Sequence, residues 1–262
     1  MSFLGLRAAL VAASIAGVSM AGAARAEDEK PPTWLPENFT ASLTGTSDYV
    51  FRGVSQTSNL PALQFTGEWT PEGGPIYIGA FVSNIKFANT VTGGNNARVE
   101  LDLLAGVRGE LGILKWDIGG IAYIYPGQKH NNPAFNTNFD YVEGTLKTSW
   151  DIFKIFTWVT NIYVSPSFQG DADNALYVEA GADYTLPWWD IALSARYGRQ
   201  FIDQNGNFGL RDFSNWSFTV SKEFFGRIVV GAGYYDTSLS RSDCGGQTIC
   251  DARGVGYVTF KF

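Results

Sequence analysis

The stretch RVELDLLAGVRGE, residues 98–110, changes between apolar and polar side chains at nearly every position. A repeat of two is typical of a β-strand with two different faces, whereas a helix repeats its apolar positions every three or four residues. The apolar face holds Val99, Leu101, Leu103, Ala105 and Val107, and the other face holds Arg98, Glu100, Asp102, Arg108 and Glu110. We therefore predict a strand here with one apolar and one charged face.

The same alternation recurs along the rest of the chain and predicts twelve strands. Strands of this length exceed the ~5–6 residues typical of soluble sheets, but they suit a strand that crosses a membrane at a tilt. Beyond the N-terminal region, no apolar run is long enough for a spanning helix, which excludes a helical membrane protein. The predicted strands are 39–53, 61–70, 75–88, 97–110, 114–125, 139–150, 155–167, 175–186, 189–201, 213–224, 227–238 and 254–262.

The connections between these segments alternate in length. Those after even-numbered strands are tight: 71–74, the stretch around Gly112, 152–154, Pro187-Trp188 and Gly226. Those after most odd-numbered strands are long and polar: 89–96, 126–138, 168–174, 202–212 and 239–253. Short periplasmic turns and long outer loops are typical of outer-membrane barrels, and a soluble sandwich has no reason to sort its loops this way. We predict an all-β fold, a transmembrane antiparallel up-and-down β-barrel of about 12 strands over residues 39–262.

The N-terminal region predicts export. Arg7 precedes an apolar run that ends in Ala24-Arg25-Ala26, which fits a secretory signal peptide over residues 1–26. The run is short for a membrane anchor and an acidic, Pro-containing segment follows, so 27–38 is expected to be a periplasmic N-terminal segment. Removal of two arginines leaves 17 basic against 25 acidic residues, a net charge of 17 − 25 = −8. This negative charge argues against a nucleic-acid partner. The signal peptide and the predicted barrel together indicate the bacterial outer membrane as the location.

Aromatic residues near predicted strand ends are consistent with a girdle at the membrane interface. They are Trp69, Trp150, Trp188, Trp189, Trp216, Phe224 and Phe225. The chain ends in VGYVTFKF, and the alternating apolar residues up to Phe260 and Phe262 resemble the signal that barrel-assembly machinery reads in such proteins. The expected partners are therefore outer-membrane lipid and lipopolysaccharide, the barrel-assembly machinery, and small polar solutes.

The stretch SDYVFRGVSQTSNLPALQ, residues 47–64, is expected to form the first hairpin of the barrel, with Asp48 and Arg52 inward and Tyr49 and Phe51 toward the membrane near the outer rim. Together with the signal peptide, the Gly-rich strands and the terminal Phe, this stretch resembles the TorF family of proteobacterial porins. The resemblance implies a barrel with a channel role and supplies neither catalytic residues nor a substrate.

Charged residues on the predicted inner faces are the candidate pore lining. Two interpretations remain open: opposed acidic and basic ladders that select solutes in a narrow pore, or pairs that only join strands inside a plugged barrel. Tyr123, Tyr125, Tyr163 and Tyr177 also point inward, either as a stacking track for sugars or as space-filling side chains. The candidates are Asp48, Arg52, Glu68, Arg98, Glu100, Asp102, Arg108, Lys115, Asp117, Glu143, Lys147, Glu179, Asp183 and Arg196.

Enzymatic activity is not expected, because the single histidine, His130, lies in a predicted outer loop without a catalytic motif around it. Cys244 and Cys250 are expected to form a disulfide in the last outer loop. Asp171 and Asp173 suggest a calcium site, but exposed carboxylates are more often solvated, so we expect no metal and no cofactor. The predicted function is a porin-like channel for passive diffusion of small hydrophilic solutes; the alternative is a non-conducting structural or adhesion barrel.

Overall fold

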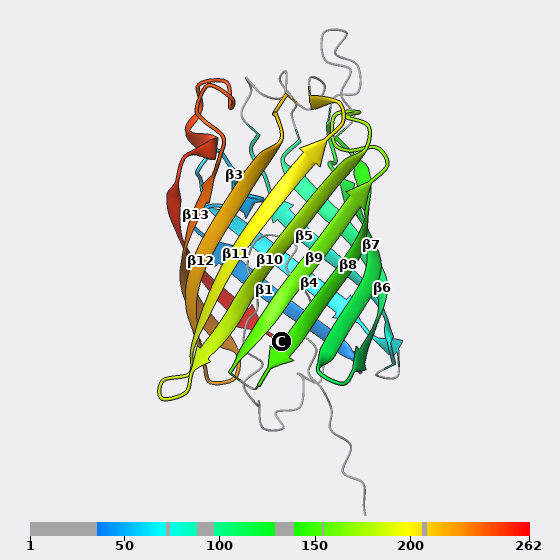
Figure 1. The fold of residues 1–262 in the computed structure, drawn as a ribbon, viewed down its shortest axis with the longest axis vertical. Helices are drawn as coiled ribbons and strands as arrows, with labels where there is room; N and C mark the ends of the chain where they lie inside the picture. Colours follow the sequence, from blue (N-terminus) through cyan, green and yellow to red (C-terminus); the bar gives the residue numbers. More distant parts are fainter. Residues whose placement is uncertain (1–35, 72–73, 88–96, 129–138, 154, 206–208) are drawn as a thin grey trace, which may run out of the picture.

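The structure is a computed structural model that describes residues 36–262 except 72–73, 88–96, 129–138, 154 and 206–208. Twelve antiparallel strands form a closed barrel in the order β1, β14, β13, β12, β11, β10, β9, β8, β7, β6, β5, β4 (Figure 1). Their bounds are β1 Phe39–Thr46, β4 Ala62–Trp69, β5 Ile76–Asn84, β6 Val99–Leu111, β7 Leu114–Ile124, β8 Tyr141–Ile152, β9 Phe156–Ser165, β10 Ala175–Leu186, β11 Ile191–Ile202, β12 Phe213–Phe224, β13 Ile228–Thr237 and β14 Arg253–Lys261. The predicted all-β barrel and its strand number are confirmed.

The barrel closes because β1 pairs with β4 on one side and with β14 on the other. The β1–β14 register runs from Ser42 opposite Lys261 to Thr46 opposite Tyr257. Every wall strand therefore has two neighbours, and the sheet leaves no row of unpaired backbone groups at an edge. The predicted signal peptide, 1–26, and most of 27–38 lie outside the described residues.

The connections sort by length as predicted. Tight turns join β6 to β7, β10 to β11 and β12 to β13 at the end of the barrel where the C-terminus lies (Figure 1). Gly112, in the β6–β7 turn, has a φ of +64°, a conformation that glycine adopts without steric cost. Two longer connections, between β9 and β10 and between β13 and β14, lie at the opposite end (Figure 1), and the second carries the short 3-10 helix η2 (Thr248–Cys250).

The two faces of the wall differ as the alternation predicts. Apolar side chains such as Leu103, Ile118 and Phe218 are exposed on the outside, and so are Phe260 in the last strand and Phe262, which follows it. All seven residues of the predicted aromatic girdle are exposed as well: Trp69, Trp150, Trp188, Trp189, Trp216, Phe224 and Phe225. Among the described residues, no helix has the length and apolar character needed to cross a membrane.

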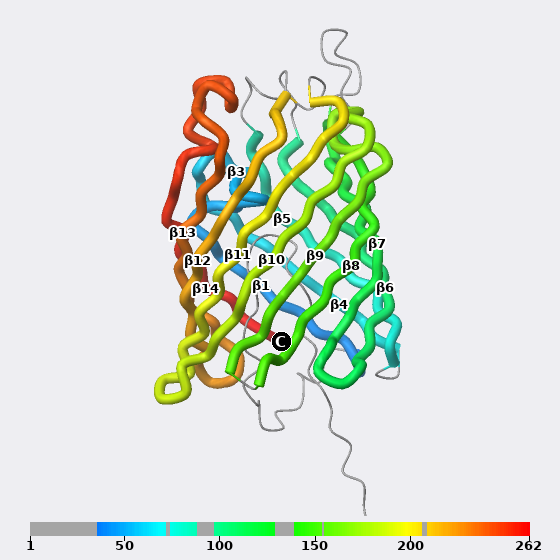
Figure 2. The backbone as a smooth tube through the Cα atoms, viewed as in Figure 1, coloured from blue at the N-terminus to red at the C-terminus, as the bar shows by residue number. Residues whose placement is uncertain are grey.

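The first predicted strand, 39–53, is wrong beyond Thr46. After Thr46 the chain leaves the wall, and residues 47–61 enter the barrel before β4 begins at Ala62. Inside, β2 (Val50–Phe51) and β3 (Val54–Ser55) form a separate two-stranded hairpin, which lies within the outline of the barrel in its upper half (Figure 2). The side chains of 47–53 do not form an apolar face for lipid, because Asp48, Tyr49 and Arg52 are all buried.

Candidate functional site: a constriction in the barrel lumen

Residues 47–61, which we call the lumenal hairpin, turn at Arg52 and Gly53. Val50 pairs with Ser55 and Phe51 with Val54, so the turn has two residues, with φ angles of +48° and +84°. Two-residue hairpins with positive φ at both positions favour Asn-Gly. An arginine at the first position costs roughly 1–2 kcal/mol in backbone strain. The reason for an arginine here therefore lies in its side-chain contacts.

The tip of the hairpin packs directly against the barrel wall. A Cβ atom on Gly53 would lie 2.8 Å from Cβ of Asn215 on β12 and 3.2 Å from Cβ of Thr237 on β13. Glycine is thus required at this position both for its φ angle and for space. The hairpin reaches across the lumen until its backbone contacts the wall.

The guanidinium of Arg52 binds in a pocket made by four neighbouring wall strands. Its Nη2 donates to Oε2 of Glu143 on β8 at 2.7 Å, and its Nη1 donates to Oε1 of Gln200 on β11 at 2.8 Å. Its carbon Cζ lies 4.3 Å from the ring centroid of Tyr177 on β10 and 5.1 Å from that of Tyr163 on β9. We call Glu143, Tyr163, Tyr177 and Gln200 the guanidinium pocket.

The carboxylate of this pocket is fixed by its own neighbours. The hydroxyl of Tyr123 donates to Oε2 of Glu143 at 3.0 Å, and the ring of Tyr123 stacks on Tyr141 at 4.3 Å between centroids. Phe51 of the hairpin packs edge-on against Tyr123. The side chains of Arg52 and Glu143 are 6% and 2% exposed, so the ion pair is shielded from solvent and its removal on one side is costly.

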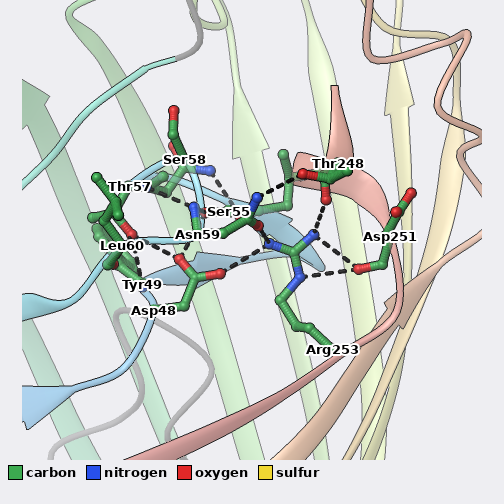
Figure 3. Close-up of polar contacts among 12 residues, drawn as sticks. Asp48, Tyr49, Ser55, Thr57, Ser58, Asn59, Leu60, Thr248, Asp251 and Arg253 are labelled. Carbon is green, nitrogen blue, oxygen red and sulfur yellow. Dashed lines mark hydrogen bonds and ion pairs between the residues drawn. The ribbon is translucent and has the colours of Figure 1, made fainter. Parts of the chain in front are cut away.

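The base of the hairpin is fastened to β14 (Figure 3). The carboxylate of Asp48 accepts from Ser55 Oγ at 2.6 Å, from Thr57 Oγ1 at 2.7 Å and from Nη1 of Arg253 at 2.9 Å. Arg253 also donates to the amide oxygen of Asn59. The base is therefore held by a charged pair with hydrogen bonds on both sides.

Arg253 links the hairpin to the last outer loop as well. Its Nη2 donates to the backbone oxygens of Thr248 and Asp251, at 3.0 and 2.8 Å (Figure 3). The same loop contains a disulfide between Cys244 and Cys250. One arginine thus joins the lumenal hairpin, the wall and a covalently closed loop.

The placement of Tyr49 and Phe51 toward the membrane is wrong. Tyr49 is 1% exposed, and its hydroxyl donates to Glu100 on β6 inside the barrel. Asp102, two residues further along β6, is also fully buried, and its carboxylate accepts no hydrogen bond from the described residues. Period-two alternation does not distinguish a wall strand from a hairpin enclosed on both sides.

Most other predicted pore-lining residues lie on the inner face of the wall. Arg108 on β6 forms an ion pair with Glu68 on β4, and its guanidinium lies 4.1 Å from the ring centroid of Tyr77. The hydroxyl of Tyr77 in turn donates to Asp117 on β7 at 2.8 Å. These residues form a second group of charges on the wall, nearer the end with the tight turns.

The remaining candidates differ in burial. Arg196 pairs with Asp183 across β10 and β11 at 2.7 Å, and Glu179 accepts from Asn161 at 3.0 Å. Lys147 is buried on β8, while Lys115 pairs with Asp151 with both side chains more than a third exposed. Arg98 precedes β6 and is exposed, so it does not join the buried group around Glu100 and Asp102.

Sequence reasoning missed Gln200 and Arg253. Gln200 occupies an inward position of a predicted strand, but it is neither charged nor a tyrosine, so its sequence context does not mark it as a pore-lining residue. Arg253 falls one residue before the last predicted strand, 254–262, and therefore within the predicted loop 239–253. The predicted inward tyrosines, Tyr123, Tyr125, Tyr163 and Tyr177, are all buried in the barrel.

The loop candidates are described only in part. His130 lies outside the described residues. Asp171 and Asp173 lie in the β9–β10 connection, and Asn174 beside them donates to Asp203 at 3.1 Å. Within the described ranges, no group of three or more metal-ligating side chains is brought together.

Comparison with known proteins adds a family and a fold. The family model described as "Bacterial protein of unknown function (Gcw_chp)" matches residues 32–260. No curated protein matches the sequence. Among solved structures, the NanC porin superposes with a TM-score of 0.55 at 10% identity, covering 85% of this chain and 98% of that one. A KdgM porin in complex with disordered oligogalacturonate gives a TM-score of 0.54 at 6% identity, covering 85% and 99%. At these identities the likeness shows the fold alone, a closed β-barrel like those of these two porins.

Proposed function

The chain belongs to the Gcw_chp family of bacterial proteins, and we propose that it is a porin-like channel of the bacterial outer membrane through which small hydrophilic solutes diffuse passively. The lumenal hairpin is the constriction of this channel. The resemblance of residues 47–64 to the TorF porin family agrees with this role.

The observation that carries the proposal is the contrast between the two faces of the wall. Leu103 on β6 and Ile118 on β7 point outward from strands whose inner positions hold Asp102, Arg108 and Asp117. An apolar outer face suits lipid, and charged groups in a lumen stay hydrated where water reaches them. A barrel built only as a compact scaffold does not need charges from β4, β6, β7, β8, β10 and β11 on its inner face.

We also propose that the chain is not an enzyme and that its exposed aromatic residues serve membrane insertion and contact with lipid. Phe260 and Phe262 at the end of β14 are exposed and serve as the signal for barrel-assembly machinery, and the exposed aromatic residues contact outer-membrane lipid and lipopolysaccharide. The expected result is incorrect membrane insertion when both phenylalanines are replaced by serine.

One observation favours the alternative of a non-conducting barrel. At the level of the hairpin, Tyr49 and Gln200 are each 1% exposed, so side chains fill the cross-section there. A permanently fixed hairpin would leave a closed barrel with a structural role. The channel and the non-conducting barrel differ in whether ions can pass the lumenal hairpin.

Planar-bilayer recording of the refolded mature protein tests the channel proposal. We expect discrete single-channel events, and a reversal potential in a salt gradient that shifts when Arg52 is replaced by alanine, because the charge at the constriction is removed. Arg241→Ala, in the outer loop, is the matched control and should leave the reversal potential unchanged. Silence of both the wild type and Arg52→Ala over a wide voltage range would establish the non-conducting barrel instead.

A further inference from the structure

We propose that the guanidinium pocket is a binding site for cationic solutes, guanidinium compounds first and primary amines second, and that Arg52 occupies it as a tethered ligand. This inference rests on the proposed function, because a solute would reach the pocket through the lumen.

The pocket belongs to the wall and does not depend on the hairpin. Tyr177 on β10 lies in register with Tyr163 on β9 and with Gln200 on β11, so the three side chains form one row across neighbouring strands. Glu143 on β8 lies two residues from Thr145, the register partner of Tyr163, and its side chain shares the inward face. Backbone pairing between adjacent strands fixes this row, so the pocket keeps its shape when the hairpin moves.

The chemistry of the pocket matches a planar cation. A carboxylate and an amide oxygen accept from the two ends of one guanidinium, and two aromatic faces lie within 5.1 Å of its carbon. An anion would meet the carboxylate of Glu143, and a neutral sugar would forgo both the ion pair and the cation–π contacts.

Arg52, which occupies the pocket in this structure, is carried by the lumenal hairpin and not by a wall strand. At its two ends the lumenal hairpin continues into β1 and β4, but among the described residues no further covalent bond joins it to the wall. Polar contacts such as Asp48 with Arg253 hold its base, and Tyr49 and Gly53 contact the wall inside the barrel. Its turn keeps Arg52 at a φ of +48°, a conformation that arginine rarely adopts. The contacts of the bound guanidinium offset this backbone strain, and the strain favours release of Arg52 from the pocket.

Arg108 provides the comparison that makes the inference specific. It binds Glu68 and lies over Tyr77 in a similar way, but it projects from β6, a wall strand paired on both sides. Its guanidinium cannot withdraw without breaking the wall. Removing Arg108 should therefore disturb the wall, whereas removing Arg52 should empty a preformed site.

Binding of methylguanidinium to the refolded full-length barrel in detergent, measured by titration calorimetry, tests the proposal. The main variant is Arg52→Asn, because Asn-Gly suits this turn and the relief of backbone strain offsets part of the cost of leaving Glu143 unpaired. We expect methylguanidinium to bind Arg52→Asn about tenfold more tightly than the wild type, whose own arginine competes. Arg52→Ala is a second variant that empties the site by a different side chain and should behave alike.

Two controls decide whether binding occurs at this pocket. Methylurea has nearly the same shape without the charge and should not bind. The double variant Arg52→Asn with Glu143→Gln should lose the added affinity, whereas Arg108→Ala alone should show none. Equal binding by the wild type and Arg52→Asn, or by Arg52→Asn with and without Glu143→Gln, would overturn the inference.

The measurement also separates this inference from the proposed function, because calorimetry in detergent does not require conduction. Binding by a barrel that passes no current in bilayers would overturn the channel and leave the site. Currents from a barrel whose Arg52→Asn variant does not bind methylguanidinium would overturn the binding site and leave the channel.

Discussion

Arg52 and Arg108 make nearly the same contacts and have different consequences. Each binds a carboxylate, Glu143 or Glu68, and each guanidinium lies close to a tyrosine ring, at 4.3 and 4.1 Å from the centroid. Arg108 joins wall strands β6 and β4, so its ion pair strengthens the barrel and leaves the lumen free. Arg52 reaches the wall from the lumenal hairpin, so its ion pair crosses the lumen. The backbone that carries a charge, more than the charge itself, decides whether it joins two wall strands or joins the lumenal hairpin to the wall.

The largest effect should come from removing the element that distinguishes the two sites. Thr46 and Ala62 are already paired at the end of β1 and β4, so residues 47–61 can be replaced by an Asn-Gly turn without moving the wall. We expect single-channel conductance to rise several-fold, because nothing then crosses the upper lumen. Arg108→Ala, in contrast, should change conductance less than the deletion does. A deletion variant with wild-type conductance would show that the hairpin is not the constriction.

We expect an intermediate effect on stability when either ion pair is broken, and the loss in the free energy of unfolding should be larger for Arg52–Glu143 than for Arg108–Glu68. Glu143→Gln leaves Arg52 buried with its charge unpaired, and we expect the free energy of unfolding to fall by about 3 kcal/mol. Glu68→Gln should cost less, about 1 kcal/mol, because the side chain of Glu68 is 14% exposed against 2% for Glu143 and retains more contact with water. Urea unfolding of the barrel in lipid vesicles measures both. Equal losses would mean that both pairs are equally hydrated.

The smallest effect is expected for the ion pair between Arg241 and Asp251, which lies outside the lumen and serves as a reference for the two pairs inside it. Hydrogen bonds from Arg241 lower the pKa of the Asp251 carboxyl, and both side chains lie in the outer loop. Because this pKa is lowered in the folded state, the contribution of the pair is present above the ordinary value near 3.9 and is lost as pH falls through the lowered value. In Arg241→Ala, carboxyl NMR should show the Asp251 midpoint rising toward about 3.9 while channel conductance at neutral pH stays unchanged. An unchanged midpoint would remove Arg241 as the cause of the lowered pKa.

The wall of the barrel was predictable because each strand carries its information locally. In residues 98–110, for example, alternation identifies both the strand and the face that holds Glu100 and Asp102, and β6 forms there. The twelve strands follow by repetition of this pattern, and the sorted connection lengths give the direction of each.

The contacts of the lumenal hairpin were not predictable because they depend on which surfaces meet in space. Alternation continues from β1 into residues 47–53, and no local feature shows that Tyr49 faces Glu100 instead of lipid. Gln200 and Arg253 gain their roles only from Arg52 and Asp48, which are far away in the sequence. The one local sign was the unusual Arg52-Gly53 turn, whose strain is visible only once the φ angles are known.

The seam between β1 and β14 also sets an order for assembly. The hydroxyls of Thr44 and Thr259 meet across it at 2.8 Å although they are 215 positions apart in the chain. Contacts of such long range form late, because the entropy of closing the loop must be overcome first. Arg253, which fastens the base of the lumenal hairpin, is the first residue of β14, so the hairpin gains this anchor only when the last strand docks. A single event therefore both closes the barrel and fastens the base of the hairpin.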